Sequence, residues 1–153
     1  MQKYLHLLVK FNLKYWRSDS DMASIFTKIV QREIPAHIVA ENAEFLSFLD
    51  INPLVEGHCL VIPKVEVDYI FDLENDVYGR LHQFAKKVAR GIEKVMPCER
   101  VGVAVVGLEV PHAHIHLIPI NTMDDMNFNR MKLKPEKEEL AAVAAKISAA
   151  IEL

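Results

Sequence analysis

Hydrophobic residues along this chain change their spacing several times, and each spacing predicts a different element. Between residues 74 and 96 they recur every three or four positions, and Pro97 follows. This predicts one long amphipathic helix that ends before the proline. A second pattern of this kind follows Pro135 and consists of Leu140, Val143, Ile147 and Ile151. It predicts a C-terminal helix with the proline in its first turn.

Shorter apolar runs predict five strands and one further helix. Residues 37–40 and 44–49 flank a turn sequence and are expected to form a hairpin. Three more strands are expected at residues 58–62, 101–106 and 112–120. The run 101–106 is apolar almost throughout, which predicts burial on both of its faces.

A short helix is expected from Ile25 to about Glu33, capped by Ser24 and stopped by Pro35. Residues 121–134 have the composition of a loop. Strands and helices come in separate blocks, which favours an α+β fold. We therefore expect an antiparallel five-stranded sheet with a long helix and a C-terminal helix.

Composition narrows the class of protein. The chain has 153 residues, enough for one domain with a real core, and a net charge of −3 that gives no basic surplus for nucleic acid. No apolar run approaches the roughly 20 residues of a membrane span. The two cysteines, Cys59 and Cys98, cannot form a four-cysteine zinc site. We expect a cytoplasmic protein that binds neither nucleic acid nor membrane.

The first 21 residues differ from the rest, because they are basic and half apolar. A signal peptide is one interpretation, but Lys10 interrupts the apolar stretch and no small-residue cleavage site follows. The favoured interpretation is that translation starts at Met22. Residues 1–21 are then an N-terminal extension outside the domain, and residues 22–153 form the domain.

Three histidines alternate with apolar residues at positions 112, 114 and 116. Because side chains alternate along a strand, all three imidazoles should project from one face, while Ala113, Ile115 and Leu117 enter a core. A single histidine of this kind would be an ordinary core or surface residue. Three side by side lose hydration and repel one another when charged, so the row needs a functional explanation. Either a metal site or metal-free catalysis by a neutral imidazole explains the row, and the periodicity leaves both open.

This row, followed by two apolar residues, resembles the signature of the histidine triad (HIT) superfamily of nucleotide hydrolases and transferases. The resemblance extends over about residues 24–122. Residues 24–36 are similar to the family's amino-terminal segment, 48–53 to its ribose-binding strand and turn, and 57–64 to its next strand. It implies a small α+β fold, usually a homodimer, that transfers a nucleoside monophosphate group through a covalent nucleotidyl-histidine.

The resemblance also implies a role for each residue of the motif. His114 would be the nucleophile, and His116 would give a proton to the leaving group. His112 would brace the histidine network, and His58 would hold the tautomer of the nucleophile. Asp50 would accept the ribose hydroxyls.

Further residues are implied around the nucleotide. Ile51 would pack near the nucleoside, and Gly107 would lend a backbone donor to the phosphate. From its position three residues before the triad, we hypothesise that Glu109 lies near the leaving group, where its charge favours a cationic amine over further phosphates. The base pocket would be lined by Phe26, Ile34 and Leu49, residues that would serve equally well as core.

The chain departs from the family pattern at three places. Ser24 and Thr27 replace the Cys-x-x-Cys of the structural zinc site found in many bacterial relatives, and hydroxyls are poor zinc ligands. We therefore expect no metal and no cofactor. The loop 105–109 is short and apolar where relatives have a polar one. Ile120 replaces a basic residue, which argues against long polyphosphate substrates.

These features predict an enzyme that releases a nucleoside monophosphate such as AMP. Its substrates would be purine nucleoside phosphoramidates or dinucleoside polyphosphates, with the phosphoramidase (Hint-like) branch favoured. The alternative is a nucleotide-binding regulatory protein with incidental hydrolysis. A metal-dependent hydrolase ranks third, because no acidic or cysteine cluster is predicted to complete a metal site beside the histidines.

Overall fold

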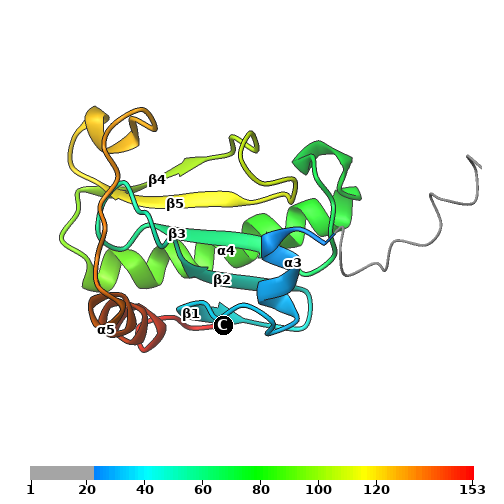
Figure 1. The fold of residues 1–153 in the computed structure, drawn as a ribbon, viewed down its shortest axis with the longest axis horizontal. Helices are drawn as coiled ribbons and strands as arrows, with labels where there is room; N and C mark the ends of the chain where they lie inside the picture. The colour runs from blue at the N-terminus through cyan, green and yellow to red at the C-terminus, as the bar shows by residue number, and fades with distance from the viewer. Residues whose placement is uncertain (1–22) are drawn as a thin grey trace, which may run out of the picture.

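One antiparallel sheet of five strands organises residues 23–153, the part of the chain that this computed structural model describes (Figure 1). Its strands are β1 (Ile38–Glu41), β2 (Phe45–Leu49), β3 (Cys59–Pro63), β4 (Arg100–Ala104) and β5 (Ile115–Ile120). They lie in the order β1-β2-β3-β5-β4. The predicted α+β fold is confirmed. The predicted extension, residues 1–21, lies outside the described residues.

Three α-helices cover the two faces of the sheet. The helix α4 (Asn75–Val95) lies behind the sheet in Figure 1, and the short α3 (Ile25–Val30) lies in front. The C-terminal α5 (Lys137–Ser148) packs into the same core as α4. Two 3₁₀ turns, η1 (Ile70–Asp72) and η2 (Met123–Met126), complete the described elements. No helix of residues 23–153 is both long and apolar enough to cross a membrane.

Alternation along the strands divides the interior into two cores. On β2, Phe45 and Leu49 join the core under α4 and α5, whereas Leu46 and Phe48 join the core under α3. On the triad segment, the residue after each histidine enters the α4 core, as predicted; these residues are Ala113, Ile115 and Leu117. The histidines are thereby directed to the other side of the sheet.

Two sequence predictions about the first helix and the fourth strand are wrong in part. The Ser24 cap is confirmed, since its hydroxyl accepts a hydrogen bond from the Thr27 amide. The helix nevertheless ends at Val30, ahead of Pro35, because Arg32 adopts a left-handed φ of 64°. The strand predicted as buried on both faces is β4, which is an edge strand paired only with β5. Its Val103 is 58% exposed.

The segment between β5 and α5, residues 121–135, is called the strap below. It contains η2 and is otherwise irregular. Gly102 on β4 makes room for it, because a Cβ there would lie 2.6 Å from the Met126 sulfur. The Leu133 amide donates to the Pro53 carbonyl oxygen at 2.9 Å. The strap is therefore anchored both to β4 and to the loop after β2. Pro135 precedes α5 instead of lying in its first turn, since Glu136 is the N-cap.

Candidate active site

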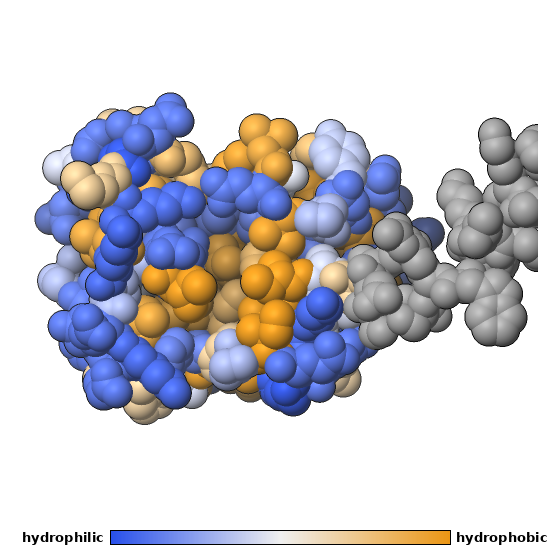
Figure 2. Space-filling view, in the orientation of Figure 1, coloured by the Kyte–Doolittle hydropathy of each residue, from blue (hydrophilic) through white to orange (hydrophobic). Residues whose placement is uncertain are grey.

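The three predicted histidines of the triad lie together on the face of the sheet that carries α3. All are buried, and His58 from the start of β3 is buried beside them. The Phe26 ring of α3 meets His114 edge to face at a centroid distance of 5.2 Å. Figure 2 shows this face, where apolar residues surround a hollow in the middle and hydrophilic residues cover the left side, in the region of the strap and α5.

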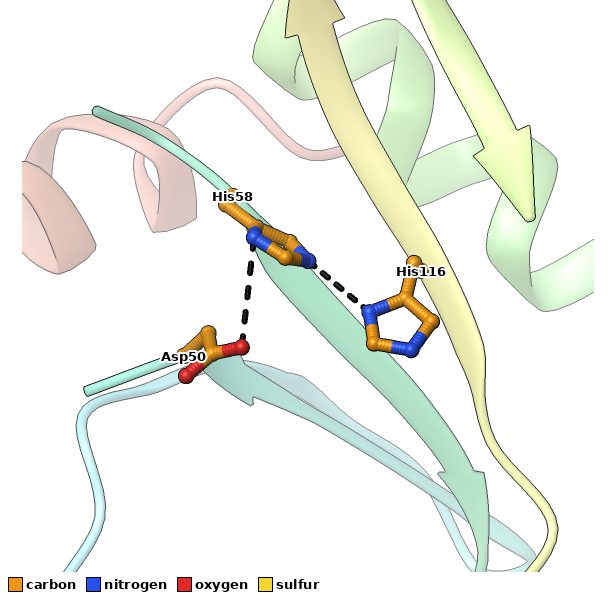
Figure 3. Close-up of side chains that lie close together, drawn as sticks. All are labelled: Asp50, His58 and His116. Atoms are coloured by element: carbon orange, nitrogen blue, oxygen red, sulfur yellow. Dashed lines mark hydrogen bonds and ion pairs between the residues drawn. The ribbon is translucent and has the colours of Figure 1, made fainter. Parts of the chain in front are cut away.

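A backbone amide sets the proton positions in the pair His58–His116. Figure 3 shows the two rings of this pair facing each other, with Asp50 on the other side of His58. The Leu54 N–H donates to His58 Nδ1 at 3.2 Å, so the proton of a neutral His58 is on Nε2. His58 Nε2 lies 2.9 Å from His116 Nδ1 and donates to it. Neutral His116 then carries its own proton on Nε2. The hydrogen bonds thus leave His116 with an N–H donor that is free for a ligand.

His114 has the opposite arrangement. Its Nδ1 lies 2.7 Å from the carbonyl oxygen of His112 and must donate to it, since a carbonyl only accepts. In a neutral His114 this leaves the Nε2 lone pair unprotonated. A free lone pair on a fixed ring is what an attacking nitrogen requires.

His112 connects the triad to α3. Its Nε2 donates to the Pro63 carbonyl at 2.8 Å, and its Nδ1 lies 2.9 Å from the Ser24 hydroxyl. The Thr27 hydroxyl is also near this nitrogen, at 3.3 Å. Glu66 accepts hydrogen bonds from the Ser24 amide and from the Thr27 hydroxyl. Sequence analysis missed Glu66, because an acidic residue in a loop carries no signal of its partners.

The donors around His112 do not suit zinc. The potential metal ligands there are two hydroxyls and one carboxylate. Both nitrogens of His112 are already hydrogen-bonded. Zinc prefers thiolates and unprotonated imidazoles. In a second group, potential metal-ligating atoms of Asp50, His58 and His116 lie within 4.8 Å of one another. The sequence did not predict an acidic residue that completes a metal site with the histidines. Both nitrogens of His58 are hydrogen-bonded there, so a cation would have to displace one of these bonds.

Burial keeps the histidine pair neutral. It is the main cause that lowers the pKa of His58 to about 3, and Lys132 and His114 contribute to this shift in the same direction. Burial is also the main cause that lowers the pKa of His116 to about 3. The pKa of His112 is lowered for the same reason, against opposing effects of Pro63 and Glu66. At neutral pH in the free protein these three imidazoles are uncharged, as the hydrogen bonds described above require.

Asp50 lies at the end of β2 with one oxygen uncommitted. Its Oδ1 accepts the Asn52 amide at 2.9 Å. Its Oδ2 is 3.9 Å from His58 Nδ1, and the side chain is 20% exposed. A carboxylate oxygen beside the histidines with no hydrogen bond among residues 23–153 is able to accept a hydrogen bond from a hydroxyl group. The neighbouring Ile51 is 60% exposed.

The structure does not bring together the three residues considered for the base pocket. Phe26, on α3, packs with Phe48 and Leu60 of the sheet. Ile34 lies at the edge of this cluster. Leu49 belongs to the opposite core and borders a cavity of about 560 Å³ against α5. Phe26 and Leu49 therefore cannot line one pocket on the triad face.

In the loop before the triad, the negative charge of Glu109 is paired with a positive charge that the sequence did not predict. Gly107 has a left-handed φ of 71°, and Leu108 after it is 88% exposed. The Glu109 carboxylate lies 3.6 Å from the ammonium group of Lys132 in the strap. Glu109 is thus paired with a cation that sequence analysis did not consider.

A second strap residue reaches the histidines. The Phe128 ring meets the His116 ring edge to face at a centroid distance of 5.0 Å. Phe128 and Lys132 were both missed, because residues 121–134 were interpreted as a loop without chemistry. An aromatic residue and a cation in the segment directly after the triad strand were the available signal.

Comparison with known proteins agrees with this geometry. The sequence profile of the HIT domain matches residues 31–123. An uncharacterized HIT-like protein of Borreliella burgdorferi is 33% identical over 132 residues, which is 81% of this chain and 95% of that protein. The adenosine 5'-monophosphoramidase HNT1 of Saccharomyces cerevisiae is 36% identical, over 65% of this chain and 63% of its own length.

Solved structures share the fold. A Hit-like protein from Bartonella henselae, crystallised with an unknown ligand, superposes with a TM-score of 0.72 at 28% sequence identity. The similarity covers 84% of this chain and 96% of that one.

Proposed function

Since the chain belongs to the HIT family, we propose that it is a nucleotide hydrolase that acts at the α-phosphorus of nucleoside phosphoramidates. The observation that carries the proposal is the pair of opposite tautomers. His114 presents an unprotonated Nε2, and His116 presents a protonated Nε2. Nucleophile and proton donor are then distinguished by their hydrogen bonds, and no metal has to activate water. Relatives named phosphoramidases support the same reaction class.

In the first step the lone pair of His114 Nε2 forms a bond to phosphorus, and the bond from phosphorus to the leaving nitrogen breaks. The departing nitrogen keeps the electron pair and needs one proton. The substrate's phosphoryl charge offsets the burial that keeps the pair His58–His116 neutral, so that the complex takes up one proton on this pair and His116 donates its Nε2 proton to the leaving nitrogen. The products are a free amine and a nucleotidyl group on His114.

In the second step water attacks the phosphorus and gives a proton back to His116. The bond to His114 Nε2 breaks, and the lone pair returns to that nitrogen. The nucleoside monophosphate leaves, the proton taken up when the substrate bound returns to solvent, and the starting state is restored. A second use of His116, as base instead of acid, follows from microscopic reversibility.

The substrate proposed is a purine nucleoside monophosphate group joined to an amine. The uncommitted Oδ2 of Asp50 accepts ribose hydroxyls, with Ile51 beside it. The base lies against Phe26 on the α3 side, and Gly107 offers its amide to the phosphate. We also propose a homodimer, because β4 is an edge strand whose exposed Val103 offers an apolar contact.

Incubation of the purified protein with adenylated amines and with dinucleotides tests the proposal, with release of AMP as the readout. We expect turnover of the adenylated amines, and no turnover of any substrate by His114→Ala. Binding of AMP without turnover by the wild type would instead support a nucleotide-binding regulatory protein. Gel filtration and light scattering test the homodimer, with a monomer at micromolar concentration as the contrary result.

A further inference from the structure

The ion pair between Glu109 and Lys132 joins two segments that border the triad. Glu109 lies three residues before His112, and Lys132 lies in the strap. Their charged atoms are 3.6 Å apart. The pair therefore connects the loop before β5 with the segment that follows it, on the side of the molecule where the histidines lie.

Lys132 is held near the histidines by its neighbours in the strap. The next residue, Leu133, is hydrogen-bonded to Pro53, three residues from Asp50. Phe128, four residues before Lys132, places its ring against His116. The ammonium group is close enough to disfavour protonation of both His58 and His116. Among residues 23–153, Lys132 is the one lysine or arginine whose charge lowers the pKa of His58 and of His116.

The partnership with Glu109 is weak. The Glu109 side chain is 81% exposed and that of Lys132 is 34% exposed. An exposed ion pair of this kind contributes little to stability, because water screens both charges. Its 3.6 Å separation is also longer than a charge-assisted hydrogen bond, which is about 2.7–2.9 Å. A phosphoryl oxygen in the site can therefore replace the carboxylate at little cost.

We propose that Lys132 is a specificity-determining residue, which exchanges Glu109 for the phosphoryl oxygens of a bound nucleotide. The exchange also leaves the Glu109 carboxylate unpaired beside the reacting group. There it favours a cationic amine as leaving group and disfavours a chain of phosphates. The inference rests on the proposed function for the identity of the ligand. Sequence analysis expected less positive charge here because Ile120 is not basic, and Lys132 supplies a positive charge that this expectation did not include.

Calorimetric titration with AMP and with adenosine tests the exchange without any need for turnover. The proteins are the wild type, Lys132→Gln and the matched control Lys134→Gln, which removes an exposed lysine from the same strap. We expect Lys132→Gln to lower the preference for AMP over adenosine by about tenfold, the size of one charge-assisted contact. Lys134→Gln should keep the preference, and Lys132→Arg should keep most of it.

Glu109→Gln supplies a second test of opposite sign. Removal of the competing carboxylate should tighten AMP binding severalfold, and this gain should disappear when Lys132→Gln is also present. An unchanged AMP preference in Lys132→Gln, or an equal loss in Lys134→Gln, would overturn the inference and leave the proposed function standing. A wild type that binds neither AMP nor adenosine would overturn both.

Discussion

Acid should destabilise this protein through the two buried histidines His58 and His116. In the unfolded chain a histidine titrates near 6.5, whereas both pKa values are about 3 in the folded protein. Below pH 6.5 the unfolded state therefore binds more protons than the folded state. The contribution of the two neutral histidines to the free energy of unfolding is fully present above pH 6.5. It is lost progressively as the pH decreases toward 3.

The size of the effect follows from the same values. At pH 5 protonation favours the unfolded chain by about 2 kcal/mol for each histidine. The two contributions add, because at this pH both imidazoles are neutral in the folded protein and independent in the unfolded chain. We expect a loss of about 4 kcal/mol between pH 7.5 and 5, a large share of the 5–15 kcal/mol typical of a domain.

Urea denaturation at the two pH values measures this loss. His58→Gln and His116→Gln should each reduce the pH-dependent part of the unfolding free energy by about 2 kcal/mol. His37→Gln is the control, because His37 lies outside the cluster, and it should keep the wild-type dependence. If both cluster variants lose as much stability as the wild type on acidification, the assignment of neutral buried imidazoles is incorrect.

Four further predictions concern catalysis, metals and the chain itself. His116→Ala should slow release of AMP from adenylated amines by about 10²–10⁴-fold but hardly affect the reaction with an activated ester. After brief reaction of this variant with the ester, mass spectrometry should find labelled AMP on His114. Equal loss of activity toward both substrates would contradict the assigned roles. EDTA should not reduce activity, and stoichiometric zinc whose removal abolishes turnover would contradict this. A chain shortened to begin at Met22 should fold and stay active, as circular dichroism and turnover will report. Ser47→Ala should stabilise the protein by about 1 kcal/mol in urea denaturation, since the buried Ser47 hydroxyl has no hydrogen-bonding partner among residues 23–153.

The parts of the fold that depend on periodicity could be predicted from the sequence. The helix at 75–95 and the separation of the histidines from Ala113 and Ile115 both follow from side-chain spacing. The same rule places Phe48 and Leu49 on opposite faces, so the assignment of Leu49 to a pocket with Phe26 was avoidable.

Other features depend on contacts between distant segments and had no local signal. An apolar run does not reveal whether its strand lies at the centre or at the edge of a sheet, and β4 is an edge strand. The contacts of Glu66 with α3 join residues about 40 positions apart. The approach of Lys132 to Glu109 depends on the path of the strap, which is irregular chain.

The donor that begins the chain of hydrogen bonds through His58 to His116 is a main-chain atom, the Leu54 amide. Every residue type except proline carries this group. The side chain of Leu54 is itself buried, so exchange for another buried apolar residue is the change that leaves the proton position on His116 unaltered. A survey of related sequences should find different apolar residues at this position but no proline, and the exclusion of proline is a mark of function that ordinary measures of sequence conservation would overlook.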